Sequence, residues 1–208
     1  DVAPIGSDYL PGHAHADTLS YELSLSGKRV LVNSGTSRYG LGTEREWERS
    51  TAAHNTVEVN GESSSEVWSS FRVARRAYPF DVSIERKGDA MIVEAAHDGF
   101  RRLAGRPVHR RRWVLGQKRL EVYDTIEGSF DYAVSRLYFH PDVQIDQDES
   151  RGSIAWSGHK AHWETERSNN ILEESHWHPE FGLSIANKCL AMAVTPSAPS
   201  CRFPLEWS

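Results

Sequence analysis

Apolar and polar residues alternate in short runs along most of the chain. In the run from Leu19 to Leu25, the apolar positions are separated by Ser20, Glu22 and Ser24. Side chains two residues apart on an extended strand point to the same face, so this alternation predicts a half-buried strand. Further strands are expected over the ranges 29–32, 56–59, 82–84, 91–95, 108–115, 119–126, 133–139, 154–156, 162–164, 182–185 and 190–194.

Turn-forming residues separate these runs, and Asn60-Gly61 is a strong hairpin signal. No amphipathic helix longer than two turns is evident. Many short strands at spacings of roughly 8–12 residues are typical of an all-β sandwich or barrel. The sequence therefore predicts one all-β domain over residues 1–208, with an irregular loop over residues 37–49. A loop of that length is more often functional than idle.

Composition narrows the function classes. The formal net charge is −5 and hydrophobic residues make up 38% of the chain, which is typical of a folded globular protein. The acidic balance argues against nucleic acid as a partner, and no apolar run is long enough to span a bilayer. Two cysteines, Cys189 and Cys201, are too few for a disulfide framework and are expected either to pair or to remain as thiols.

Histidines supply the first candidate chemistry. His13 and His15 are two residues apart, so an extended strand would place both imidazoles on one face. Imidazole nitrogen is a good zinc ligand, and His54 follows two strand-like segments later as a third candidate. Asn33, in the run Asn33–Thr36, offers only a neutral carbonyl oxygen, and a turn role explains it equally well.

Four motifs together resemble the heparinase II/III family in its C-terminal domain. They are GHAHADTLSYEL from Gly12, NSGT from Asn33, Tyr39, and RSTAAHNTVEVNG from Arg49. Shorter pieces agree as well: HDGF from His97, HRR from His109 and VYD from Val122. The resemblance is strongest over the first 60 residues and weak after Pro141.

The resemblance implies a multi-stranded antiparallel β-sandwich that follows an N-terminal α/α toroid in a longer parent chain. It also implies β-elimination of a uronate-containing acidic polysaccharide bound between the two domains. On this basis His13 and Tyr39 are expected to be catalytic, and His15, Asn33 and His54 to hold a structural zinc ion. The chain opens at Asp1 without an initiator Met, so we expect a piece of a longer protein. Because the resemblance implies that the helical domain supplies the neutralising groups and the main tyrosine, we expect this fragment to be inactive alone. A periplasmic or secreted parent is favoured.

One residue departs from the family pattern. The third metal ligand is commonly Asp in that family, and Asn33 stands in its place here. The substitution lowers the expected zinc affinity and leaves Asp17 as a substitute oxygen ligand.

The chemistry of elimination suggests two further residues. Removing the proton next to a uronate carboxylate requires a base, an acid and a group that neutralises the carboxylate. Arg49 and Asn55 are candidates to bind that carboxylate or to position loops, and a buried structural role is equally expected for Arg49.

Two other functions remain open and two are disfavoured. A non-catalytic carbohydrate-binding sandwich with a decayed lyase site would explain Asn33, and a lectin-like module would need exposed aromatic residues. A cupin-like metal barrel also begins with two histidines on a strand, but it needs a Glu where Leu19 and Ser20 stand. A serine hydrolase is disfavoured because the G-x-S-x-G motif is missing.

Overall fold

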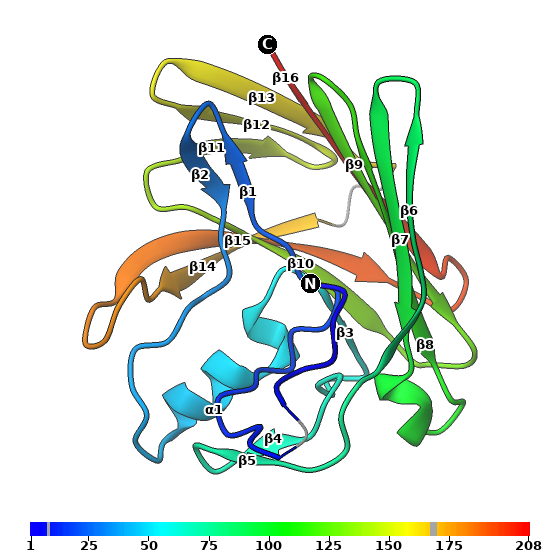
Figure 1. Cartoon of the computed structure of the whole chain (residues 1–208). Helices are drawn as coiled ribbons and strands as arrows, with labels where there is room; N and C mark the ends of the chain where they lie inside the picture. The colour runs from blue at the N-terminus through cyan, green and yellow to red at the C-terminus, as the bar shows by residue number, and fades with distance from the viewer. Residues whose placement is uncertain (8, 167–169) are drawn as a thin grey trace.

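The computed structural model describes residues 1–7, 9–166 and 170–208. Two large antiparallel sheets form the molecule (Figure 1). This confirms the predicted all-β sandwich. Within the described residues, no helix is long and apolar enough to cross a membrane.

The six-stranded sheet has the order β1-β2-β10-β15-β14, and β3 also pairs with β10. Its strands are β1 (Leu23–Leu25), β2 (Lys28–Leu31), β3 (Val57–Val59), β10 (Ala133–Phe139), β14 (Asn170–Trp177) and β15 (Ile185–Val194). The central strand β10 contacts β2, β3 and β15, so it joins the first sixty residues to the C-terminal part of the chain.

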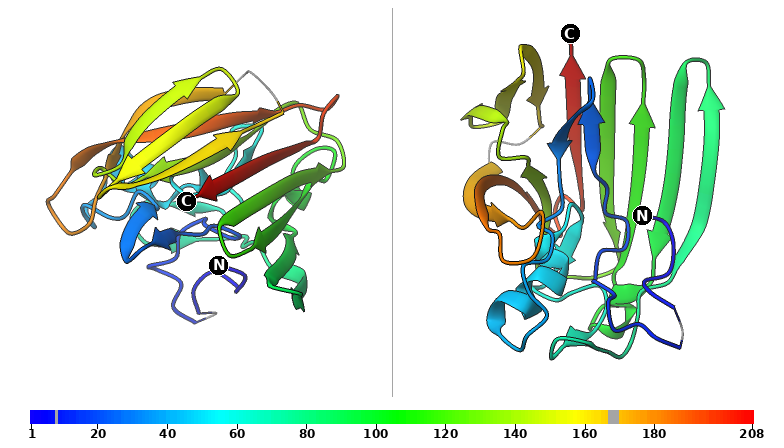
Figure 2. Two further views of the ribbon diagram at one scale, coloured as in Figure 1. Left: turned by 90° about the horizontal axis from the view of Figure 1, so that it is seen from above. Right: turned by 60° about the vertical axis from the view of Figure 1, so that its left-hand side comes forward.

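The eight-stranded sheet has the order β11-β12-β13-β16-β9-β8-β7-β6. Its strands are β6 (Pro79–Lys87), β7 (Ala90–His97), β8 (Val108–Leu115), β9 (Arg119–Glu127), β11 (Gln144–Asp148), β12 (Arg151–Trp156), β13 (His159–Glu164) and β16 (Ser200–Trp207). Figure 2 shows β6, β7, β8 and β9 running side by side with β16.

The main hydrophobic core lies between the two sheets. The six-stranded sheet contributes Leu31, Phe139 and Leu190, and the eight-stranded sheet contributes Trp163 and Phe203. All five are at most 2% exposed. This burial follows from the alternation in the sequence, because each strand presents every second side chain to the opposite sheet.

Short elements gather at one end of the sandwich. The helix α1 (Thr43–Arg49) is followed by the 3-10 turn η1 (Thr51–Ala53), and the hairpin of β4 (Val67–Trp68) and β5 (Arg72–Val73) lies at the same end (Figure 1). A second 3-10 turn, η2 (Gly99–Arg102), follows β7.

Three sequence-based expectations are corrected. The predicted strand over residues 19–25 begins only at Leu23, and Leu19 itself has a left-handed φ of 63°, which an extended strand does not allow. Residues 182–184 precede β15 instead of forming a strand. The expected loop over residues 37–49 ends in α1, which buries Arg45, Glu48 and Arg49, so hydrophobic periodicity gave no sign of it.

Candidate functional site

His13 and Tyr39 lie side by side at the end of the sandwich that carries α1 and the β4–β5 hairpin. Their ring centroids are 5.1 Å apart, and the ring of Phe71 lies 5.7 Å from His13. His13 is exposed, and Tyr39 is 41% exposed. The structure thus places two proton-carrying side chains together where a ligand can reach them. The His13–His15 segment is a turn followed by irregular chain, not the expected strand.

Arg49 holds the backbone under this exposed pair. Its side chain is fully buried, and its guanidinium donates to the carbonyl oxygens of Ala14, Trp68 and Arg72 at 3.0, 3.3 and 3.2 Å. A buried guanidinium with three carbonyl partners cannot reach a substrate carboxylate. The expected substrate contact of Arg49 is therefore corrected to its alternative role, the positioning of the His13 segment and of the β4–β5 hairpin.

Asn55 is likewise a positioning residue. It is fully buried, its Nδ2 donates to the carbonyls of Tyr21 and Val32 at 2.8 and 3.1 Å, and its Oδ1 accepts the Tyr138 N–H at 2.7 Å. Its own backbone N–H donates to Asn33 Oδ1 at 2.9 Å. The predicted contact of Asn55 with substrate is corrected, because both polar atoms of its side chain already bind backbone groups.

His15 and His54, here called the site pair, contact each other. His15 Nδ1 and His54 Nε2 are 3.1 Å apart, and His54 Nδ1 is 2.7 Å from the Ser50 carbonyl oxygen. His54 is 3% exposed, whereas His15 is half-buried. The sequence-based expectation that these two histidines converge is met at hydrogen-bonding distance.

Arg45 closes the other end of the site pair. Its Nη1 lies 3.3 Å from His15 Nε2 and 3.3 Å from Thr36 Oγ1. The guanidinium is also 5.2 Å from the centre of the Tyr39 ring, within the range of a cation–π contact. Glu48 lies 3.9 Å from Arg45 and accepts hydrogen bonds from Ser37. Arg45 therefore connects the buried histidines with exposed Tyr39, a role that the sequence alone did not reveal.

Burial keeps both histidines of the site pair neutral. Desolvation, together with the neighbouring His54 and Arg45, lowers the pKa of His15 to about 2. Desolvation also lowers the pKa of His54, although Asp17 and the Ser50 carbonyl act in the opposite direction. Neutral imidazoles can bind a metal or form directed hydrogen bonds.

A structural zinc ion fits these residues poorly. Among the described residues, no group of three or more His, Cys, Asp or Glu side chains is arranged to hold a metal. Structural zinc sites generally have four ligands, and the third residue of the expected set, Asn33, is neutral and already accepts the Asn55 N–H. Zinc, with Asp17 as a substitute ligand, remains an untested prediction.

A second histidine pair, here called the core pair, was not identified as a unit from the sequence. His97 and His109 are fully buried, with His97 Nε2 and His109 Nδ1 3.2 Å apart. His109 Nε2 lies 2.7 Å from Asp124, which forms a bidentate ion pair with Arg111 at 2.6 and 2.8 Å. The antiparallel register that places His97 opposite His109 was the missing information.

The Arg111–Asp124 ion pair holds the backbone that carries the candidate site. Arg111 Nη1 donates to the carbonyl oxygens of Leu19 and Asn55 at 2.7 and 2.5 Å. Leu19 follows the His15 segment and Asn55 follows His54. The core pair and its ion pair therefore fix the backbone of both segments that carry the site pair.

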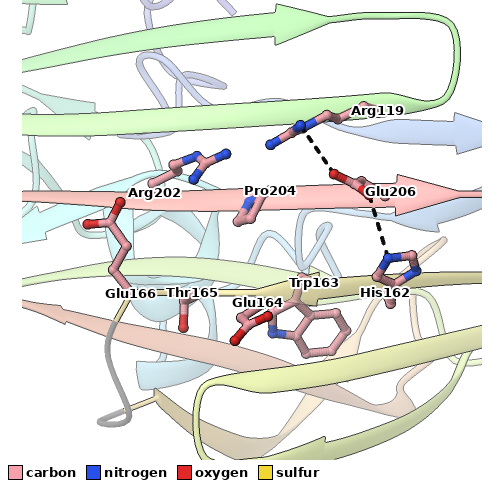
Figure 3. Close-up of a pocket in the computed structure, with 9 residues that line it drawn as sticks. All are labelled: Arg119, His162, Trp163, Glu164, Thr165, Glu166, Arg202, Pro204 and Glu206. Atoms are coloured by element: carbon pink, nitrogen blue, oxygen red, sulfur yellow. Dashed lines mark ion pairs between the residues drawn. The ribbon is translucent and has the colours of Figure 1, made fainter.

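A separate cavity of about 430 Å³ is lined mainly by residues of β9, β13 and β16, and its lining includes neither the site pair nor the core pair (Figure 3). Its charges largely neutralise one another, since Glu206 lies 3.2 Å from Arg119 and 3.6 Å from His162. Trp163 in its wall is only 2% exposed and offers no free face for stacking. This cavity is therefore a poorer candidate for the functional site than the end of the sandwich that carries His13 and Tyr39.

The two cysteines lie apart from this site. Cys189 is buried on β15 and Cys201 is half-buried on β16, and both are present as thiols. The structure thus selects the thiol alternative of the two that the sequence left open.

Comparison with known proteins gives a consistent family assignment. Residues 1–204 match the family model described as heparinase II/III-like, C-terminal. No curated protein matches the chain significantly.

Solved structures show the same fold. A heparan sulfate lyase from Pedobacter heparinus superposes with a TM-score of 0.76 at 15% identity, covering 100% of this chain and 32% of that one. A protein described as a heparinase III gene product gives a TM-score of 0.78 at 14% identity, again covering 100% and 32%. This chain thus spans about a third of the length of these solved relatives.

Proposed function

This chain belongs to the heparinase II/III-like C-terminal family, and we propose that it is one part of a polysaccharide lyase. Its substrate would be a uronate-containing acidic polysaccharide, cleaved by β-elimination. The observation that carries the proposal is the exposed contact between His13 and Tyr39, whose ring centroids are 5.1 Å apart. One solved relative, named as a heparan sulfate lyase, supports the substrate class.

The reaction needs two proton transfers at neighbouring atoms. A base removes the proton next to the uronate carboxylate, and an acid protonates the oxygen of the departing sugar. Imidazole and phenol can both carry protons in this way. We assign the base or acid role to His13 and the acid role to Tyr39.

Neutralisation of the uronate carboxylate must come largely from elsewhere. Arg45 is 1% exposed and faces the Tyr39 ring, and Arg49 is fully buried on backbone carbonyls. Because solved relatives extend far beyond the matched part, we propose that an N-terminal helical toroid of the parent supplies the missing groups. The 208-residue chain alone would then be inactive. A substrate of polymer size also favours a periplasmic or secreted parent.

The test uses the parent protein and the 208-residue chain side by side. Each is incubated with heparin, heparan sulfate and alginate, and the unsaturated uronate product is followed by its ultraviolet absorbance. The parent should release product from at least one polymer, and the 208-residue chain from none. The Tyr39→Phe parent should lose roughly 10²–10⁴-fold in rate, the usual value of one positioned proton carrier.

A non-catalytic binding module is the second candidate, favoured by Asn33 in place of the family's acidic residue. If the intact parent binds an acidic polymer in an affinity assay but releases no unsaturated product, the binding module replaces the lyase. If the Tyr39→Phe protein keeps the full rate, the lyase can stand but the assignment of Tyr39 fails.

A further inference from the structure

The contacts around the site pair favour one arrangement of hydrogen bonds. Thr36 Oγ1 lies 3.5 Å from His15 Nε2, but Arg45 Nη1 is closer to that nitrogen, and Thr36 Oγ1 itself accepts from Arg45. The guanidinium of Arg45 can only donate, so His15 Nε2, 3.3 Å away, must accept. The Ser50 carbonyl can only accept, so His54 Nδ1, 2.7 Å away, must carry a proton. Neutral imidazole has one N–H, so His15 Nδ1–H donates to His54 Nε2 across the remaining 3.1 Å.

This arrangement uses every ring nitrogen of both histidines. The lone pair of His15 Nε2 points to Arg45, and the lone pair of His54 Nε2 accepts the proton of His15. Asn33 Oδ1, the third expected metal ligand, accepts the Asn55 N–H at 2.9 Å. Neither imidazole retains a lone pair for a metal ion.

From these contacts we propose that Arg45 replaces the metal ion as the group that fixes the site pair. The guanidinium sets the protonated nitrogen of His15, and His15 in turn orients His54. Arg45 is 1% exposed and bonds Thr36 Oγ1 as well, so its position is built into the core of this end.

The local charges agree with this proposal. Arg45 is balanced by Glu48, which lies 3.9 Å away and is fully buried. The change from the family's Asp to Asn33 removes one negative charge from the ligand set. A divalent ion beside Arg45 would then add two positive charges to a buried group that already has its counter-ion, which is unfavourable at low dielectric.

The proposal also gives Arg45 a positioning function for catalysis. Its guanidinium lies 5.2 Å from the centre of the Tyr39 ring. The same side chain therefore orders the buried site pair and the exposed phenol. This inference concerns the support of the site, so it stands or falls independently of lyase activity.

Nitrogen-15 NMR of the histidine rings in the 208-residue chain tests the proposal directly. His15 and His54 should both be protonated on Nδ1. The core pair is an internal control with the opposite pattern, because Gly99 N–H donates to His97 Nδ1 and His109 Nε2 faces the Asp124 carboxylate. Addition of zinc or of EDTA should leave all four signals and the thermal midpoint unchanged, and elemental analysis should find far less than one zinc per chain.

Variants give a second readout. Arg45→Met should change the His15 ring signals without altering those of the core pair. Arg38→Met is the matched control, because Arg38 is in the same region and its ion pair among the described residues is a 3.8 Å contact with exposed Glu44. Asn33→Asp combined with Arg45→Met should acquire zinc binding, seen as a thermal midpoint that rises with added zinc.

Two results would overturn the proposal. One is a wild-type chain that carries one zinc per molecule and loses thermal stability in EDTA. The other is a His15 ring without a proton on Nδ1. If Arg45→Met does not fold, Arg45→Lys and the wild-type spectrum decide, since a single ammonium group cannot reproduce the fork of the guanidinium.

Discussion

The two histidine pairs are nearly identical in ring geometry but differ in the groups at their ends. Ring centroids are 5.2 Å apart in both, and the interplanar angles are 76° for the site pair and 84° for the core pair. The site pair runs from the Arg45 cation to a backbone carbonyl. The core pair runs from a backbone N–H to the Asp124 carboxylate.

This difference indicates that the core pair stabilises the fold, whereas the site pair is connected to the candidate site. The core pair, Asp124 and Arg111 are all buried, so the unit is closed and serves the fold. The site pair ends on Arg45, whose other face meets the 41%-exposed ring of Tyr39. Through Arg45 the site pair is therefore connected to an exposed side chain, whereas the core pair ends on a buried carboxylate.

The largest effect is expected when the core pair loses its anion. Asp124→Asn leaves the buried Arg111 charge without a counter-ion and weakens the support of the Leu19 and Asn55 carbonyls. Removing one partner of a buried ion pair costs about 3–5 kcal/mol of unfolding free energy. Urea denaturation measures it. A loss below about 1 kcal/mol would show that the core pair does not support the site.

Acid should destabilise the fold through the core pair. Burial lowers the pKa of His109 and lowers that of His97 well below its usual value, so both stay neutral when folded. Their unfolded pKa is about 6.5. As the pH falls below 6.5, His97 and His109 each bind a proton in the unfolded state but not in the folded state. The free energy of unfolding therefore falls.

The slope from these two histidines approaches about 2.7 kcal/mol per pH unit only well below pH 6.5, so between pH 7.5 and 5.5 they should lower the unfolding free energy by about 2.7 kcal/mol in total. The site pair, whose pKa values are also lowered, should add to this loss. Desolvation alone raises the pKa of Asp124, but Arg111 and His109 hold it well below its usual range, so loss of that carboxylate acts only at lower pH. Urea denaturation between pH 7.5 and 5.5 checks the slope. Unfolding free energy that is constant across this interval would contradict neutral buried histidines.

Breaking the site pair at Arg45 should cost less. Arg45→Met leaves His15 Nε2 and Thr36 Oγ1 without their donor, which corresponds to about 1–3 kcal/mol. It also removes the positive charge beside Glu48, but that contact of 3.9 Å is looser than the bidentate Arg111–Asp124 pair, and Ser37 still donates to Glu48. Arg38→Met in the same region should stay within about 0.5 kcal/mol. The comparison fails if the two substitutions have the same effect on the thermal midpoint.

The smallest effect on stability is expected at an exposed ion pair that contacts neither the site pair nor the core pair. Arg151 and Glu164 are 2.8 Å apart, but their side chains are 73% and 60% exposed. Exposed ion pairs contribute at most about 1 kcal/mol, so Glu164→Gln should barely change the urea midpoint. A large loss here would mean that Asp124→Asn cannot be interpreted through burial.

The sheets were predictable because alternation reports burial directly. The expected strand over residues 108–115 coincides with β8 and that over 133–139 coincides with β10. The helix α1 was missed because it turns the charged residues Arg45, Glu48 and Arg49 inward. Hydrophobic periodicity cannot detect a helix whose buried face is polar.

The sequence identified most residues of the candidate site but not the role of each residue. The approach of His15 and His54 was expected from the family motifs and is observed. Burial of Arg49 and Asn55 depends on long-range packing, so their backbone-holding roles were not decided by the sequence. Arg45 stood in a charged run, and only the fold shows that it reaches His15.

One measurement tests most directly whether the exposed residues carry the reaction while the buried residues carry the stability. It is the rate of unsaturated uronate release by the His13→Ala parent, measured together with its unfolding free energy. His13 is exposed, so the account predicts a rate loss of roughly 10²–10⁴-fold with stability within about 0.5 kcal/mol of wild type. A His13→Ala parent that retains the wild-type rate on a polymer that the wild type cleaves would contradict it.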